Sequence, residues 1–178
     1  MIVEGLTMSD LPHPDKTFHI FDRLLSQPGS LCKIESDQPK VIYQKLSRYQ
    51  DTTGKALYFW REGVGLHRID IPNIYAPNTK SFIKALHHVS LSIHFGIYLF
   101  ANIKNALHDP QAIKLIEQIA NNQVGELNRS SQQRGSNKLL IFVGNDLDIP
   151  EQLEEYFTVI RHRAARKYQR SPTHQLAS

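Results

Sequence analysis

The chain has 178 residues and a mass of 20.4 kDa, which suits one domain with a hydrophobic core and is short for two. Hydrophobic residues make up 40% and charged residues 21%, a composition that excludes a disordered or fibrous protein. The single cysteine, Cys32, excludes an intramolecular disulfide and a cysteine-based zinc site. The sequence lacks a transmembrane-length apolar run and a signal-peptide pattern, so we expect a cytoplasmic protein.

The net charge of +4 is concentrated near the C-terminus. Subtracting the five cations of residues 161–170 leaves residues 1–160 at −1, and no acidic residue follows Glu155. The folded part is therefore expected to be nearly neutral, which argues against a nucleic-acid-binding surface on it. These cations form a candidate anion-binding segment: Arg161, Arg163, Arg166, Lys167 and Arg170. We divide the sequence into a flexible leader (1–15), a single domain (16–160) and a basic tail (161–178).

Hydrophobic spacing predicts a helix over residues 16–27 and a short buried strand over 31–35. A second helix follows, with Asp37 as its N-cap, Pro39 in its first turn and Gly54 in the left-handed position after it. The remaining elements are expected in this order: a strand over 55–60, a long polar connection over 61–78, a helix over 79–93, a strand over 95–101, a helix capped by Asp109, a loop over 128–137, a strand over 138–143, a short acidic helix after Asp148, and a strand over 157–160.

Strands that alternate with helices predict βαβ units and a mostly parallel sheet of about five strands, flanked by helices in three layers. The strand sequences are continuous apolar runs, which is typical of strands covered on both faces. The predicted core consists of Ile34, Ile42, Leu46, Leu57, Leu86, Leu99, Ile116, Leu140, Phe142 and Val143.

A phosphate-binding loop would be expected directly after the first strand, with the pattern G-x-x-x-x-G-K-[ST]. Residues 36–40 are instead Ser-Asp-Gln-Pro-Lys, without glycine. The proline removes a backbone donor, and the carboxylate of Asp37 would repel phosphate. The pair Gly54-Lys55 lies after a helix and before a strand, which is the reverse of the required order. We therefore expect neither ATP hydrolysis nor a nucleotide cofactor.

Other catalytic patterns are weak. No carboxylate follows the strand 95–101, but Asn145 and Asp146 follow the strand 138–143 and form a candidate polar site at a strand end. They could orient a water or a partner group, or simply form a polar turn. His87, His88 and His94 lack the i, i+4 spacing of paired metal ligands, so we expect solvated or packed histidines and no metal site.

Residues 34–66 and residues 138–160 resemble segments of an AAA-type ATPase family encoded in cyanobacterial and plastid genomes. The resemblance spans about residues 30–160, and its most specific parts are Trp60…Gly65-Leu66 and the sequence Ile-Pro-Glu-Gln-Leu-Glu at 149–154. It implies the N-terminal, non-catalytic half of that family, with a RecA/AAA-like fold that lacks a phosphate-binding loop. The ATPase domain that follows in the family is expected to be absent here.

Three functions remain open. The first is a non-catalytic regulatory or scaffolding module of degenerate P-loop type that binds another protein. The second is weak binding of nucleic acid or an anionic surface through the basic tail. The third is an enzyme with an unrecognised site, using Asp146 or His108. The missing phosphate loop and the nearly neutral domain favour the first.

Overall fold

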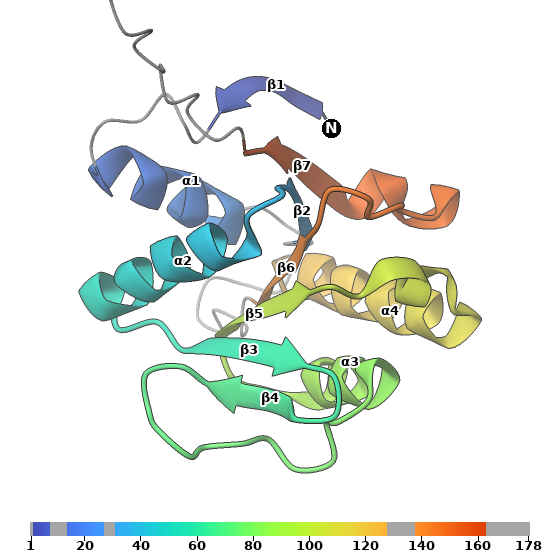
Figure 1. Ribbon diagram of the computed structural model, residues 1–178. Coiled ribbons are helices and arrows are strands. Elements are labelled where there is room, and N and C mark those ends of the chain that lie inside the picture. Colours follow the sequence, from blue (N-terminus) through green and yellow to red (C-terminus); the bar gives the residue numbers. More distant parts are fainter. Residues whose placement is uncertain (1, 8–13, 27–30, 128–137, 163–178) are drawn as a thin grey trace, which may run out of the picture.

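The computed structural model describes residues 2–7, 14–26, 31–127 and 138–162 (Figure 1). A single seven-stranded sheet has the order β1-β7-β2-β6-β5-β3-β4. In chain order the elements are β1 (Ile2–Thr7), α1 (Pro14–Ser26), β2 (Leu31–Glu35), α2 (Pro39–Thr53), β3 (Leu57–Arg61), β4 (Gly65–Arg68), α3 (Phe82–Leu91), β5 (Gly96–Ala101), the 3₁₀ helix η2 (Lys104–His108), α4 (Pro110–Leu127), β6 (Lys138–Val143), the 3₁₀ helix η3 (Glu151–Tyr156) and β7 (Phe157–Arg161).

The sheet is mostly parallel, as predicted. Strand β4 is antiparallel to β3, and the other neighbouring strands are parallel to one another. If β1 and β4 are set aside, the order of the remaining strands across the sheet is β7-β2-β6-β5-β3. Counted along the chain, these are the fifth, first, fourth, third and second of the five strands. This α/β arrangement is consistent with an AAA/RecA-like fold.

Two strands lie where the sequence predicted none. Residues 2–7 form β1 rather than a loose leader, and they pair with β7, which is more than 150 residues later in the chain. Residues 65–68 form β4 inside the predicted polar connection. Local sequence patterns gave no signal for either strand, because each forms by pairing with the edge of another strand, β1 with β7 and β4 with β3.

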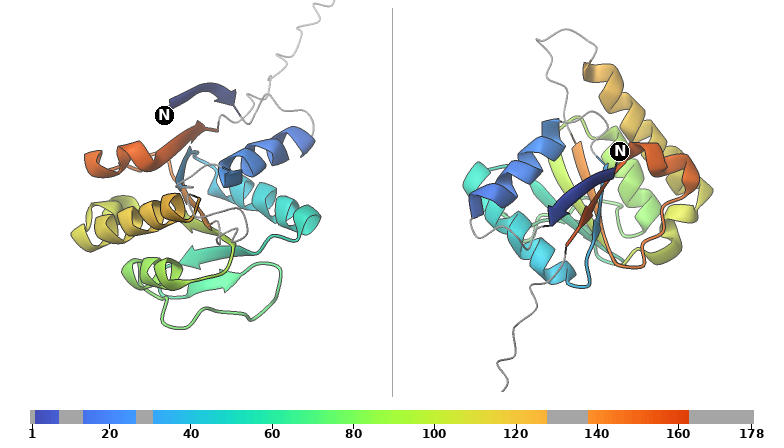
Figure 2. Two further views of the ribbon diagram at one scale, coloured as in Figure 1. Left: turned by 180° about the vertical axis from the view of Figure 1, so that it is seen from behind. Right: turned by 90° about the horizontal axis from the view of Figure 1, so that it is seen from above.

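Helices cover both faces of the sheet in three layers (Figures 1 and 2). Helices α1 and α2 lie on one face, and α3 and α4 lie on the other. All ten predicted core residues are buried, which confirms the predicted core. On the α1/α2 face these are Ile34, Ile42, Leu46, Leu57, Leu99 and Val143. On the α3/α4 face they are Leu86, Ile116, Leu140 and Phe142.

Helix ends follow the sequence signals with one correction. Gly54 has φ of +66°, the left-handed conformation predicted after α2. Asp109 Oδ1 accepts a hydrogen bond from the backbone N–H of Gln111 at 2.7 Å, as expected for the cap of α4. At α2 the N-cap position is Gln38 and not Asp37, which is exposed. The hydroxyl of Ser36 accepts the Gln38 N–H at 3.0 Å, so the turn before the helix is closed by a serine.

The β3–β4 hairpin is joined to the connection that precedes α3 by hydrogen bonds around Thr79. The indole Nε1 of Trp60 donates to the Thr79 carbonyl at 2.9 Å, and the Leu66 N–H donates to Thr79 Oγ1 at 2.9 Å. The Thr79 hydroxyl in turn donates to the Ala76 carbonyl at 2.7 Å. Gly65 has φ of +101°, and a Cβ there would lie 2.6 Å from Thr79 Oγ1. Only glycine fits at this position.

Candidate functional site

Ligands of open α/β sheets bind beyond the carboxyl ends of the parallel strands. At this edge β2 leads into Ser36, β5 leads into Asn102, and β6 leads into Gly144. Asn102 has φ of +59°, so the backbone turns sharply after β5. The chemistry of this edge therefore depends on what the three turns present.

The turn after β2, where a phosphate loop would lie, is occupied by protein contacts. Ser36 is 2% exposed, and its Oγ lies 2.9 Å from Nδ1 of His162. Ser36 Oγ also accepts a hydrogen bond from the Gln38 N–H at 3.0 Å. The N–H of Val41 donates to the Gln38 carbonyl at 2.9 Å. These backbone and hydroxyl groups are therefore already engaged and do not form an open cradle for phosphate.

The surroundings of His162 shift the pKa of its imidazole downward. Burial lowers the pKa of its imidazole, the positive charge of Lys45 lowers it further, and Asp37 acts in the opposite direction. The backbone N–H of His162 donates to the Glu35 carbonyl at 2.9 Å. The contacts of the sheet thus include residue 162, two residues past the boundary predicted at 160.

Arg161 belongs to β7 and not to a separate tail. Its Nε lies 3.1 Å from Oε2 of Glu35, and Lys33 Nζ lies 3.1 Å from Oε1 of the same carboxylate. Burial acts to raise the pKa of Glu35, but the hydrogen bonds and charges of Lys33 and Arg161 outweigh it and lower the pKa. The other predicted anion-binding residues lie outside the described residues: Arg163, Arg166, Lys167 and Arg170.

Asn145 and Asp146 lie in an exposed bend after β6. These two residues do not line the cavity at the carboxyl edge of the sheet. From β6, the lining of that cavity includes Val143. His108, another predicted candidate, has its Nε2 3.1 Å from Oδ2 of Asp148. The side chains of His108 and Asp148 are 45% and 81% exposed.

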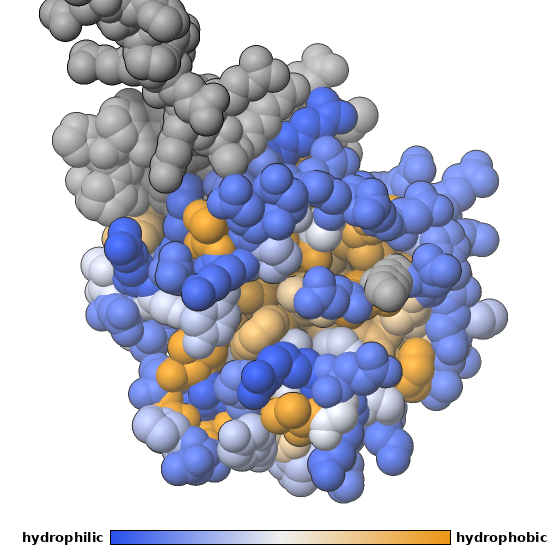
Figure 3. Space-filling view, in the orientation of Figure 1, coloured by the Kyte–Doolittle hydropathy of each residue, from blue (hydrophilic) through white to orange (hydrophobic). Residues whose placement is uncertain are grey.

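A cavity of about 460 Å³ lies at the carboxyl edge on the α2 side of the sheet. Its basic lining residues are Lys40 from the first turn of α2, Arg61 from the end of β3 and His67 from β4. The rest of its lining consists of Pro39, Tyr43, Phe59, Leu99, Ala101, Asn102 and Val143. In the space-filling view, pale and hydrophobic residues lie near the middle of this face, framed by hydrophilic ones (Figure 3). Sequence analysis missed this site because four separate strands and a helix contribute to it.

His67 is a half-buried polar group of the cavity. Burial lowers the pKa of its imidazole, and the nearby positive charge of Arg61 lowers it further, while a hydrogen bond to the Gly65 backbone acts to raise it. Its Nδ1 is buried and has no hydrogen-bond partner within the described part of the chain. The ring lies 5.6 Å from that of Phe59, between centroids.

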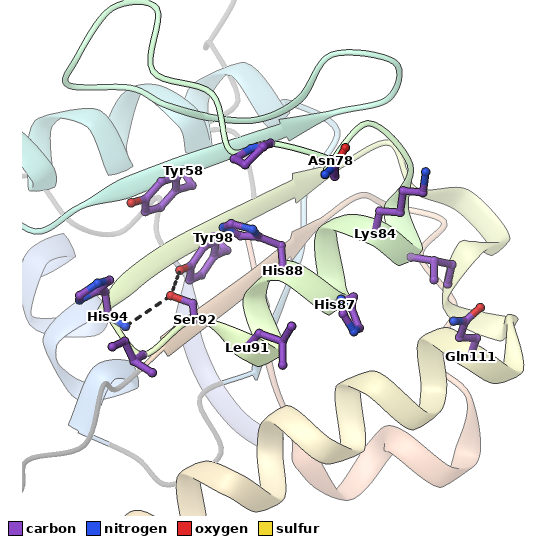
Figure 4. Close-up of a pocket in the computed structure, with 13 residues that line it drawn as sticks. Tyr58, Asn78, Lys84, His87, His88, Leu91, Ser92, His94, Tyr98 and Gln111 are labelled. Carbon is purple, nitrogen blue, oxygen red and sulfur yellow. Dashed lines mark hydrogen bonds between the residues drawn. The ribbon is translucent and has the colours of Figure 1, made fainter.

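A second hollow of about 740 Å³ lies beside α3 (Figure 4). Tyr58 and Tyr98 stack in it with centroids 5.0 Å apart. Ser92 Oγ accepts hydrogen bonds from the Tyr98 hydroxyl at 3.5 Å and from the His94 N–H at 3.3 Å. Two apolar lining residues, Leu91 and Ile93, are 67% and 79% exposed.

The three clustered histidines all line this hollow. Burial and the neighbouring His87 lower the pKa of His88. Among the residues that the structure describes, no group of three or more His, Cys, Asp or Glu side chains is placed to hold a metal ion. Cys32 is fully buried in β2, and burial raises the pKa of its thiol far above the usual range, as fits a small core residue.

The family comparison matches residues 19–162 to the N-terminal domain of SpoVK-like AAA ATPases. The chain belongs to this family. No curated protein and no solved structure matches the chain.

This SpoVK-like N-terminal domain accounts for nearly all of the described structure. The matched segment begins within α1 and ends at His162, the buried residue that contacts Ser36. The strand β1 lies before it, and residues 163–178 lie after it. None of the described helices is both long and apolar enough to span a membrane.

Proposed function

We propose that this domain is a non-catalytic regulatory or scaffolding module that binds another protein through the hollow beside α3. The observation that supports the proposal is the exposure of Leu91 and Ile93, 67% and 79%, at a large concave surface. Exposed apolar groups at a hollow rimmed by polar side chains are typical of protein-binding sites.

The chemistry of the hollow indicates the kind of partner. Its polar lining includes Lys84, His87, His88 and His94, and no acidic side chain of the described residues lines it. Such a surface fits a partner segment with apolar anchors flanked by carboxylates. The closed turn at residues 36–40 and the family assignment as an N-terminal domain support a binding role without ATP hydrolysis.

The test starts with a photo-crosslinking amino acid at His87, expressed in the source cells, and the cross-linked protein is then purified. We expect the purified partner to bind the wild-type chain and to bind a Leu91→Asp/Ile93→Asp variant at least tenfold more weakly. The matched control is Ile71→Asp/Ile74→Asp, because these residues are also exposed but do not line the hollow. Equal affinities for the two double variants would refute this site.

A second candidate function is anion binding by the basic tail. The charge distribution favours it, because four cations follow His162 without any acidic residue. If all four met duplex phosphates, log affinity would fall with log salt at a slope of about −3.6, from about −0.9 per contact. We expect weak, sequence-independent DNA binding at about 50 mM salt that is lost near 200 mM. Binding that survives truncation after His162 would place the site on the folded domain instead.

We also propose that the chain belongs with the cyanobacterial and plastid members of its family, on the basis of the segments 34–66 and 138–160. A phylogenetic tree of the family would test this placement.

A further inference from the structure

The cavity at the carboxyl edge carries charge of one sign. Lys40 and Arg61 are exposed at it, and His67 completes a basic group contributed by three different elements. No acidic side chain of the described residues lines this cavity. Walls of low polarity strengthen the field of such a group, so the cavity is electrostatically suited to an anion.

The remaining walls are suited to an apolar, flat body. Leu99 and Val143 are each 1% exposed and form a buried floor. The rings of Tyr43 and Phe59 pack at 5.4 Å between centroids and line the same space. The volume of about 460 Å³ is large for a bare inorganic ion and lies within the common range for small-molecule sites.

The cavity cannot hold a nucleotide in the manner of a phosphate loop. The N–H groups of Gln38 and Val41 are engaged by Ser36 and by the Gln38 carbonyl, and Pro39 has none. No carboxylate from the described residues lines the cavity to hold a magnesium ion. The groups at this cavity that attract an anion most strongly are the cationic side chains of Lys40 and Arg61.

We propose that this cavity binds a small organic anion, one that carries a phosphate or carboxylate group on an aromatic body and needs no metal ion. The anionic group lies between Lys40 and Arg61 at the mouth. The aromatic body lies against Tyr43, Phe59 and the apolar floor. This site is separate from the hollow beside α3, so either proposal can fail without the other.

Isothermal titration of the full chain with phenyl phosphate and with benzoate, in metal-free buffer, tests the ligand chemistry. We expect at least one of the two to bind at least tenfold more tightly than inorganic phosphate and phenol, which each supply one half of the ligand. The tighter of the two identifies the preferred anionic group. Added magnesium is expected to leave the affinity unchanged. If neither compound binds more tightly than the fragments, the proposal is wrong.

Variants test the location. We expect the double variant Lys40→Gln/Arg61→Gln to bind the ligand at least tenfold more weakly. The control Arg48→Gln/Lys114→Gln removes the same charge at exposed positions outside the cavity, so it should alter the affinity less than twofold. Ala101→Leu narrows the cavity and should weaken phenyl phosphate more than inorganic phosphate. Circular dichroism confirms folding, and Ala101→Val replaces Ala101→Leu if that variant does not fold. Equal affinity for the two charge variants would overturn the assignment.

Discussion

Replacing Thr79 with valine should destabilise the protein through two hydrogen bonds of one hydroxyl. Thr79 is 1% exposed, and valine has nearly the same shape, so the change isolates the polar contribution. The variant leaves the buried N–H of Leu66 without its acceptor and the carbonyl of Ala76 without its donor. The bond from Trp60 to the Thr79 backbone carbonyl does not involve the side chain and is retained.

The magnitude follows from the cost of unsatisfied buried groups, about 1–3 kcal/mol each. The Leu66 N–H is buried and carries the full cost, whereas the Ala76 carbonyl is only part-buried and carries less. We therefore expect Thr79→Val to lower the free energy of unfolding by about 2–4 kcal/mol. Thr79→Ser keeps the hydroxyl and should cost about 1 kcal/mol for the lost methyl group.

Urea unfolding measures both variants, with far-UV circular dichroism for the whole domain. The fluorescence of Trp60, the single tryptophan, reports on the Thr79 region itself. Thr52→Val is the control, because Thr52 is exposed and its hydroxyl donates to the Arg48 carbonyl within the same helix, α2. That variant should stay within about 0.5 kcal/mol of the wild type. If Thr79→Val is no less stable than Thr79→Ser, the Thr79 hydroxyl does not stabilise the hairpin.

Three further predictions concern the core, pH dependence and catalysis. Leu99→Ala and Leu140→Ala each remove three carbons, on opposite faces of the sheet, and each should lower the free energy of unfolding in chemical denaturation by about 2–5 kcal/mol. The control Leu91→Ala, at an exposed position, should lower it by under about 0.5 kcal/mol. Similarly small values for both core variants would mean that the strands are misassigned. Because the pKa of His162 is lowered in the folded state, the unfolded chain binds more protons than the folded chain just below about pH 6.5. The free energy of unfolding should therefore fall as the pH drops through that value. His162→Gln should flatten this dependence of the free energy of unfolding on pH. Purified protein should release no phosphate from magnesium–ATP, and turnover that Asp146→Ala abolishes would contradict this.

The parallel core of the fold could be predicted because its signals are local. The ranges predicted for β2 and β6, residues 31–35 and 138–143, coincide with the observed strands. Both are runs rich in apolar residues, although β2 also carries Lys33 and Glu35, and they lie in the centre of the sheet with helices on both faces. In such runs the hydrophobic pattern alone specifies the strand.

The edges of the sheet could not be predicted in the same way. Strand β4 is only four residues, Gly-Leu-His-Arg, with one fully apolar side chain. It is held by pairing with β3 and by the contact of Leu66 with Thr79, thirteen residues away. The motif Trp60…Gly65-Leu66 was visible as a resemblance, but Thr79, the residue that all three contact, was not.

The cavity illustrates a further limit of sequence analysis. Lys40, Arg61 and His67 belong to a helix start, a strand end and an edge strand, and no spacing rule connects them. They lie together because the order of strands in the sheet places β3 beside β5 and β4 beside β3. Conversely, Asn145 and Asp146 followed the rule that strand ends carry function, yet they lie in an exposed bend outside the cavity.

The turn after β2 connects the loss of one function to the shape of the remaining site. A phosphate loop leaves several backbone N–H groups free before its helix, and that arrangement is costly unless a ligand or water satisfies them. Here the side chain of Ser36 satisfies the Gln38 N–H, and Nδ1 of His162, the residue after β7, is hydrogen-bonded to the same hydroxyl. The turn is thus complete without a ligand, and it anchors the last residue of the matched domain. The anion recognition that we propose uses instead the side chains of Lys40 and Arg61, which line the neighbouring cavity and take no part in the Ser36–His162 hydrogen bond.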